Sequence, residues 1–175
     1  MNSEKSRSDA VFHSGVLEAQ ARYGNQERAR RIIEAMPSFS ELDDEQITFI
    51  EALPFFFLAT SDKQGNLQCN FKGGGPGILI SQDKTTLCYP EFPGNDMMLS
   101  VGNILVNPHV GLLAISFENR RRLKINGSAT IQGATDHPLQ QRWPDARLIV
   151  VIHLDQVIRN CSRRIPRMME PNSSN

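Results

Sequence analysis

Apolar positions in the first third of the chain recur at helical spacing. Between residues 12 and 36 this spacing predicts two helices, because Gly24 interrupts the pattern and Asn25 can cap the second helix through its side chain. A third, shorter helix is predicted just after Asp43 or Asp44, where an acidic residue precedes an apolar run that a proline ends. The chain therefore begins with helices.

From residue 55 onward the pattern changes to short apolar, aromatic and β-branched runs separated by turn residues. The runs predicted as strands are Phe55–Thr60, Leu67–Lys72, Ile78–Ile80, Thr86–Tyr89, Val110–Phe117, Arg121–Ile131 and Arg147–Ile158. One inserted helix is predicted from a cap at Asn95 to about Val106, where Asn107-Pro108 stops it. Six or seven hairpin-linked strands predict a mainly β fold, a small antiparallel barrel with helical additions.

The length of 175 residues, with 39% apolar residues, suits one domain with one core. We expect residues 12–168 to form that domain, helices included. Residues 1–11 are expected to be extended or disordered, and residues 169–175 are expected to form a disordered tail.

Composition narrows the functional classes. No run approaches the roughly 18 apolar residues of a membrane helix, and the polar start lacks the apolar segment of a secretory signal. Three widely spaced cysteines favour a reducing compartment, so a cytoplasmic location is expected. A net charge of zero argues against nucleic-acid binding. Residues 119–175 nevertheless carry ten basic and four acidic side chains, which suit either a discrete anionic ligand or a solvated strand face.

Common catalytic signatures are missing from the sequence. The cysteines and the four histidines are too scattered for a metal motif, so no metal site is expected. The glycine cluster Gly73 to Gly77 lacks the Lys-Ser/Thr and helix of a nucleotide-binding loop. These glycines could instead allow a kink or bulge at a barrel corner.

A series of short stretches occurs in an order that resembles a known family. The stretches are Phe12-His13-Ser14-Gly15, Phe57-Leu58-Ala59-Thr60, Lys72-Gly73-Gly74-Gly75-Pro76-Gly77, Tyr89-Pro90, Gly94-Asn95, Asn103 to Pro108, Gly111-Leu112-Leu113, Leu123 to Gly127 and Asn160-Cys161. Together they resemble the flavin-nucleotide-binding branch of the pyridoxamine 5′-phosphate oxidase-like family. The resemblance implies a split β-barrel homodimer that holds FMN at the subunit interface.

The resemblance also implies cofactor-binding positions. Lys72 ends a strand before the glycine bend and is a candidate for a phosphate or ring contact; the alternative is a solvated lysine. Asn95 could serve an anion or simply cap its helix. Arg122 and Lys124 alternate with apolar residues and so lie on the unpacked strand face, where they could contact flavin or solvent. The full set of expected FMN contacts is Asn70, Lys72, Gly73, Gly74, Tyr89, Asn95, Ser100, Asn103, Arg122 and Lys124.

Two departures from the family pattern bear on function. Asp96 stands where the oxidases hold the FMN phosphate with basic residues, and it would repel a phosphate. The tail around Cys161 and Arg164 differs from the segment that grips the substrate phosphate in those oxidases, so oxidation of pyridoxamine phosphate is not expected. Cys161 could be a redox thiol near the flavin or an inert packed residue.

The leading hypothesis is an FMN-dependent oxidoreductase acting on a small molecule or on reduced nicotinamide. The alternatives are a non-catalytic flavin carrier and a split barrel that binds another planar cofactor, a deazaflavin or haem. No residue is assigned a catalytic role.

Overall fold

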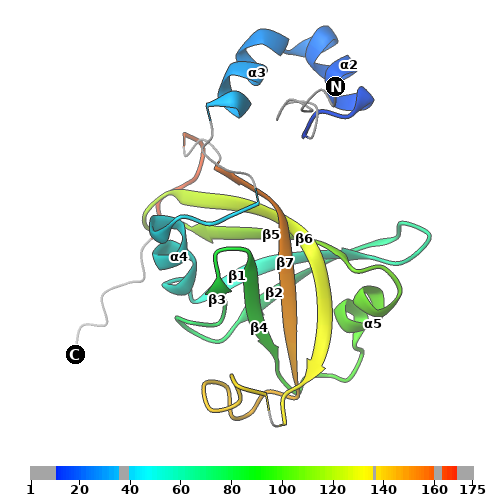
Figure 1. The fold of residues 1–175 in the computed structure, drawn as a ribbon, viewed down its shortest axis with the longest axis vertical. Coiled ribbons are helices and arrows are strands. Elements are labelled where there is room, and N and C mark those ends of the chain that lie inside the picture. The colour runs from blue at the N-terminus through cyan, green and yellow to red at the C-terminus, as the bar shows by residue number, and fades with distance from the viewer. Residues whose placement is uncertain (1–10, 36–39, 136, 160–162, 169–175) are drawn as a thin grey trace, which may run out of the picture. The chain divides into compact units, whose positions relative to one another are not determined.

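The computed structural model describes residues 11–35, 40–135, 137–159 and 163–168. The chain divides into two compact units, residues 1–38 and residues 39–175. The first unit is helical, and the second contains the whole β-sheet (Figure 1). The expectations for residues 1–10, for residues 169–175 and for Cys161 concern positions outside the described residues.

The first unit contains helices α2 (Ser14–Tyr23) and α3 (Gln26–Glu34). Gly24 ends α2, and its amide donates a hydrogen bond to the Gln20 carbonyl. The Asn25 side chain caps α3 by accepting a hydrogen bond of 2.9 Å from the Arg28 amide. The predicted break and the predicted cap are both confirmed.

The second unit begins with helix α4 (Asp44–Glu51). Asp43 forms a capping box with Gln46, in which each side chain accepts a hydrogen bond from the other residue's backbone amide. The helix ends at Ala52, before Pro54, as the sequence predicts. The capping box fixes where α4 starts. Phe49 and Ile50 on the apolar face of this helix pack into the hydrophobic core.

Seven strands follow α4 and form one antiparallel sheet. They are β1 (Phe55–Ser61), β2 (Leu67–Gly73), β3 (Ile80–Asp83), β4 (Thr86–Glu91), β5 (His109–Ser116), β6 (Arg121–Gly133) and β7 (Leu148–Arg159), with helix α5 (Leu99–Val106) between β4 and β5. The strand order is β2-β1-β5-β6-β7-β4-β3. The predicted fold, mainly β with six or seven antiparallel strands and added helices, is confirmed.

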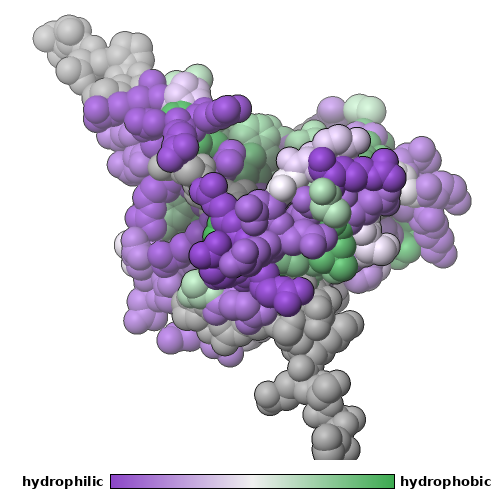
Figure 2. Space-filling model, turned by 90° about the horizontal axis from the view of Figure 1, so that it is seen from above, coloured by the Kyte–Doolittle hydropathy of each residue, from purple (hydrophilic) through white to green (hydrophobic). Residues whose placement is uncertain are grey.

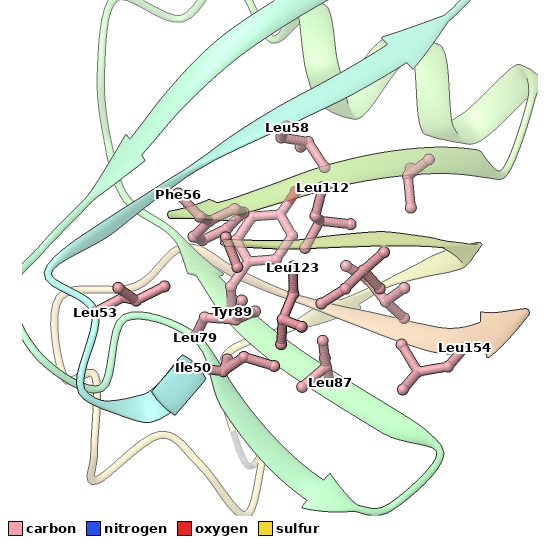
Figure 3. Close-up of a cluster of buried hydrophobic side chains, with 14 of the residues drawn as sticks. Ile50, Leu53, Phe56, Leu58, Leu79, Leu87, Tyr89, Leu112, Leu123 and Leu154 are labelled. Atoms are coloured by element: carbon pink, nitrogen blue, oxygen red, sulfur yellow. The ribbon is translucent and has the colours of Figure 1, made fainter. Parts of the chain in front are cut away.

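The sheet curls until its two ends approach each other. Strands β1 and β4 are separated by three strands in the sheet, yet the Phe56 and Tyr89 rings meet edge to face with centroids 5.3 Å apart. Both side chains are fully buried in the main core, whose close packing around Tyr89 is drawn in Figure 3. Curling buries the apolar face of a sheet that no second sheet covers.

Successive side chains of β1 alternate between the inner and the outer face of the sheet. Phe56, Leu58 and Thr60 are buried in the barrel, whereas Phe57 is half-buried and Ala59 exposed on the opposite face. Phe57 and Ala59, on the outer face, line a hollow.

Strand β7 is buried on both faces over part of its length. Val150 and Ile152 belong to the main core, while Ile149 and Val151 pack in a smaller cluster with Trp143 from the β6–β7 connection. A strand that is buried on both faces needs apolar residues at successive positions, which accounts for the β-branched sequence of β7.

The glycine cluster forms a tight corner after β2. Gly75 and Gly77 have left-handed backbone angles, with φ of +87° and +81°. The turn that they form delays β3, so the strand predicted from Ile78 begins only at Ile80. Trp143 donates a hydrogen bond of 3.2 Å from Nε1 to the Gly77 carbonyl and holds the corner against the β6–β7 connection.

Among the described residues, no helix is long and apolar enough to cross a membrane. The face drawn in Figure 2 is mainly hydrophilic, with hydrophobic areas between hydrophilic residues. The large apolar side chains exposed in the second unit are Leu67, Phe71, Met97, Leu99, Leu105, Val106 and Met168.

Gly127 and Gly133 of β6 provide a matched test of the bulge that bends this strand. The pairing of β6 with β7 shifts register between Asn126 and Gly127, and a Cβ on Gly127 would come within 3 Å of the His153 carbonyl oxygen. We expect Gly127→Ala to lower the free energy of unfolding by about 1–3 kcal/mol, because backbone must move. Chemical denaturation monitored by Trp143 fluorescence measures this change in the free energy of unfolding.

Gly133→Ala is the control, since nothing lies within 4 Å of its Cβ position. It should leave stability unchanged or raise it by roughly 0.4–1 kcal/mol. Equal destabilisation by both substitutions would show that the bulge does not require a glycine.

Candidate functional site

A polar cleft opens where the end of β2 approaches the segment that follows β4. It is lined by Asn70 and Lys72 of β2, by Glu91, by residues 92 and 94–100, and by Arg147. Its volume is about 140 Å³, below the roughly 300 Å³ at the lower end of ordinary small-molecule pockets. The cleft can therefore hold a small polar group such as a phosphate, but not a whole ring system.

Lys72 is held in place inside this cleft. Its Nζ lies 2.6 Å from Glu91 Oε2 and 5.8 Å from the centre of the Tyr89 ring. The lysine side chain is only 13% exposed, so the alternative of a solvated lysine is wrong. The ion pair joins β2, one edge of the sheet, to the end of β4 and bridges the split in the barrel.

A second ion pair lies at the same cleft. Arg147 Nη1 is 2.7 Å from Asp96 Oδ1, and the Arg147 amide donates to the Glu91 carbonyl. Asp96 was expected to repel a phosphate, but the structure pairs its charge with a guanidinium. Sequence reasoning missed Arg147, because the residue enters the cleft only through the long-range pairing of β4 with β7.

Residues 95–98 form an irregular turn rather than the start of a helix. Asn95 Oδ1 accepts a hydrogen bond of 3.1 Å from the Met97 amide, so Asn95 does not cap α5. Asp96 and Met98 have left-handed backbone angles, with φ of 58° and 51°, and these angles break the helical path until Leu99. The predicted helix start was wrong by three residues for this reason, because the cap lies at Met98 and not at Asn95.

Asn70 offers the cleft an unused donor. Its Nδ2 atom is buried and has no hydrogen-bond partner in the described part of the chain. A buried donor without a partner costs free energy, so a polar ligand that accepted its hydrogen bond would recover that cost.

The other expected contacts of this region lie in different surroundings. Ser100 is buried in the first turn of α5 and lines the cleft. Asn103 instead donates a hydrogen bond of 3.0 Å to Thr60 Oγ1 and fastens α5 to β1. The Gly74 amide donates to the Pro54 carbonyl, as does that of Gly75, while Gly73 ends β2. These glycine amides are used within the chain, in agreement with the structural interpretation of the cluster.

Tyr89 is fully buried, and its hydroxyl has no hydrogen-bond partner in the described structure. Burial, with a smaller effect of the nearby Glu91 charge, raises the pKa of this phenol far above its ordinary value. The Tyr89 side chain does not line the cleft, nor does it line the hollow on the outer face of the sheet.

A larger hollow lies on the outer face of the sheet. It has a volume of about 600 Å³, within the ordinary range for small-molecule sites. The lining residues are Phe57, Ala59, Cys69, Gly111, Leu112, Leu113, Arg122, Lys124 and Asn126, from strands β1, β2, β5 and β6. Most of this surface is apolar.

Arg122 and Lys124 are the two cations of the hollow. They alternate with buried Leu123 and Ile125, so the predicted strand face is confirmed. Neither cation forms an ion pair with a described residue, and Arg122 Nε is buried without a hydrogen-bond partner. The hollow thus combines an apolar floor with positive charge that no carboxylate of the described residues neutralises.

Two cysteines are described, and they differ in surroundings. Cys69 is exposed and lines the hollow, whereas Cys88 is buried. Burial, together with the negative charge of Asp83, raises the pKa of the Cys88 thiol to about 11. No cluster of three histidine, cysteine or carboxylate side chains occurs in the described ranges, so they contain no candidate metal site.

The cleft and the hollow lie on a barrel whose sequence matches a known family. A family model described as pyridoxamine 5′-phosphate oxidase matches residues 42–161. The chain belongs to this family. A search of curated proteins by sequence returned no match.

Three solved structures with a similar fold are distant in sequence from this member of the pyridoxamine 5′-phosphate oxidase family. A putative pyridoxamine 5′-phosphate oxidase from Lactobacillus delbrueckii is 22% identical with a TM-score of 0.54, and the match covers 68% of this chain and 94% of that one. HupZ from Group A Streptococcus is 18% identical with a TM-score of 0.54, covering 73% and 99%. An F420 reductase is 21% identical with a TM-score of 0.50, covering 67% and 98%. At these identities the matches establish the fold of the family and no more.

Tyr89 and Thr60 give a matched test of buried hydroxyls in this family member. Because the Tyr89 hydroxyl has no partner, we expect Tyr89→Phe to leave the free energy of unfolding unchanged or to raise it by about 1 kcal/mol. Thr60→Val removes the acceptor of the Asn103 hydrogen bond and should lower stability by roughly 1–3 kcal/mol. Urea unfolding curves compare the two variants. A loss of stability in Tyr89→Phe as large as that in Thr60→Val would mean that the phenol has a partner.

Proposed function

We propose that this protein is a flavoprotein that binds FMN between two copies of the chain and transfers hydride to or from a small molecule or reduced nicotinamide. The observation that carries the proposal is the outer hollow, which is large, mostly apolar and bordered by two cations that pair with no carboxylate in the described part of the chain. Membership of the pyridoxamine 5′-phosphate oxidase family supports it.

The lining residues suit the two chemically different ends of FMN. Phe57, Ala59 and Leu113 provide an apolar floor for a flat ring, and Arg122 and Lys124 can donate to the polar ring edge. The cleft offers Lys72, the free Asn70 amide and the α5 turn around Ser100 to a phosphate. When bound, the isoalloxazine supplies the redox chemistry, and the protein's part is to bind and orient it.

The position of the two sites on β2 favours a dimer. Cys69 lines the hollow, while its neighbours in the strand, Asn70 and Lys72, line the cleft. Successive side chains of a strand point to opposite faces, so the two sites lie on opposite sides of β2. A two-fold pair of chains can place the hollow of one copy opposite the cleft of the other, which a single copy cannot do for a rigid ligand.

Titration with FMN and with riboflavin tests the proposal. We expect about one FMN per chain by equilibrium dialysis and a dimer by light scattering. Arg122→Ala combined with Lys124→Ala should weaken the binding of both flavins by about tenfold or more, because riboflavin has the same ring. Lys63→Ala, which removes an exposed lysine from the β1–β2 turn, is the control and should change neither affinity.

Several outcomes would contradict the proposal. Failure to take up FMN, or equal loss of affinity in Lys63→Ala, would count against a flavin in the hollow. Retention of a deazaflavin or a Soret band from haem in place of FMN would assign the site to another planar cofactor. FMN that binds but remains oxidised with NADH, NADPH and small-molecule donors under anaerobic conditions would indicate a flavin carrier.

A further inference from the structure

The cleft already contains an anion of its own. Glu91 Oε2 lies 2.6 Å from Lys72 Nζ, and the two side chains are only 19% and 13% exposed. A carboxylate in this position takes the charge-assisted hydrogen bond that an incoming phosphate would otherwise receive from the lysine. Any anionic ligand must therefore share Lys72 with Glu91 or displace it.

The formal charges that line the cleft cancel. Lys72 and Arg147 are positive, Glu91 and Asp96 are negative, and each cation is within 3 Å of one carboxylate. The outer hollow differs in this respect, since none of the ion pairs between described residues involves its two cations. A ligand with two negative charges gains much less in a neutral cleft than in a positive one.

We propose that Glu91 is a specificity-determining residue, whose carboxylate limits the affinity of the cleft for a doubly charged phosphate group. This inference rests on the proposed FMN site. Glu91 sets how strongly the phosphate contributes to flavin binding, and thus how well the protein distinguishes FMN from riboflavin.

Glu91 should limit phosphate affinity more than Asp96 does, because the Glu91 side chain is the more deeply buried of the two. The Arg147 and Asp96 side chains are 45% and 69% exposed, so water and salt screen their charges. Glu91 and Lys72 are largely shielded from solvent, and charges in such surroundings interact more strongly. Loss of the Glu91 charge should therefore matter more to a bound anion than loss of the Asp96 charge.

Glu91 could also act by holding Lys72 in position, and the geometry separates the two roles. The Tyr89 ring lies under the ammonium at 5.8 Å and supports it independently of Glu91. A glutamine at position 91 keeps an acceptor oxygen for Lys72 and removes only the charge. Glu91→Gln thus tests charge and largely preserves position.

The experiment measures the affinities of FMN, riboflavin and inorganic phosphate by isothermal titration calorimetry. The proteins are the wild type, Glu91→Gln and the control Asp96→Asn. We expect Glu91→Gln to bind FMN and phosphate about tenfold more tightly, a change of about 1.4 kcal/mol, with riboflavin affinity unchanged. Asp96→Asn should strengthen FMN binding by less than about threefold.

Unchanged or weaker FMN and phosphate binding by a folded Glu91→Gln protein would overturn the proposal, since Glu91 would then position Lys72 or play no part. Should this variant fail to unfold cooperatively, Glu91→Ala also removes the charge, and tighter binding of FMN and phosphate by that variant would support the same role. Tighter binding of phosphate without any binding of FMN would support the role of Glu91 and reject the flavin. No binding of any anion by any variant would overturn both.

Discussion

One antiparallel sheet has to bury its own apolar face, and the rest of the structure depends on how it does so. The sheet curls until Phe56 of β1 meets Tyr89 of β4, but its edges never join by backbone hydrogen bonds. The remaining split is bridged by the ion pair between Lys72 and Glu91. A polar cleft at this point follows from the fold, because a gap between sheet edges leaves side chains rather than paired backbone to fill it.

The curl also leaves an outer face on β1, β5 and β6, where residues of β1, β2, β5 and β6 line the hollow. Phe57, Leu113 and Arg122 share that face, where apolar surface lies beside positive charge that no described carboxylate pairs with. An exposed face of this composition is characteristic of a binding surface. The two candidate regions thus have one origin: a sheet that closes on the inside leaves a split at its edges and a hollowed face outside.

Local sequence signals predicted most of the fold. The turn between β1 and β2, the cap at Asn25 and the helix that starts after Asp43 each depend on residues close in sequence, and all formed as expected. The cleft was harder to predict. Arg147 and Glu91 are brought together by the pairing of β4 with β7, and no local pattern encodes that register. The start of α5 was misplaced because positive φ angles at Asp96 and Met98 leave no sequence signal.

In the proposed dimer, each flavin site takes its cleft from one copy and its hollow from the other. Mixed dimers distinguish this arrangement from a site within one chain. A Lys72→Gln chain is combined with an Arg122→Ala, Lys124→Ala chain, and FMN bound to the mixed dimer is counted by native mass spectrometry. We expect one FMN per mixed dimer at wild-type affinity, because one cleft and the opposing hollow remain intact. Binding no better than in either parent dimer, or a protein that stays monomeric with FMN bound, would contradict it.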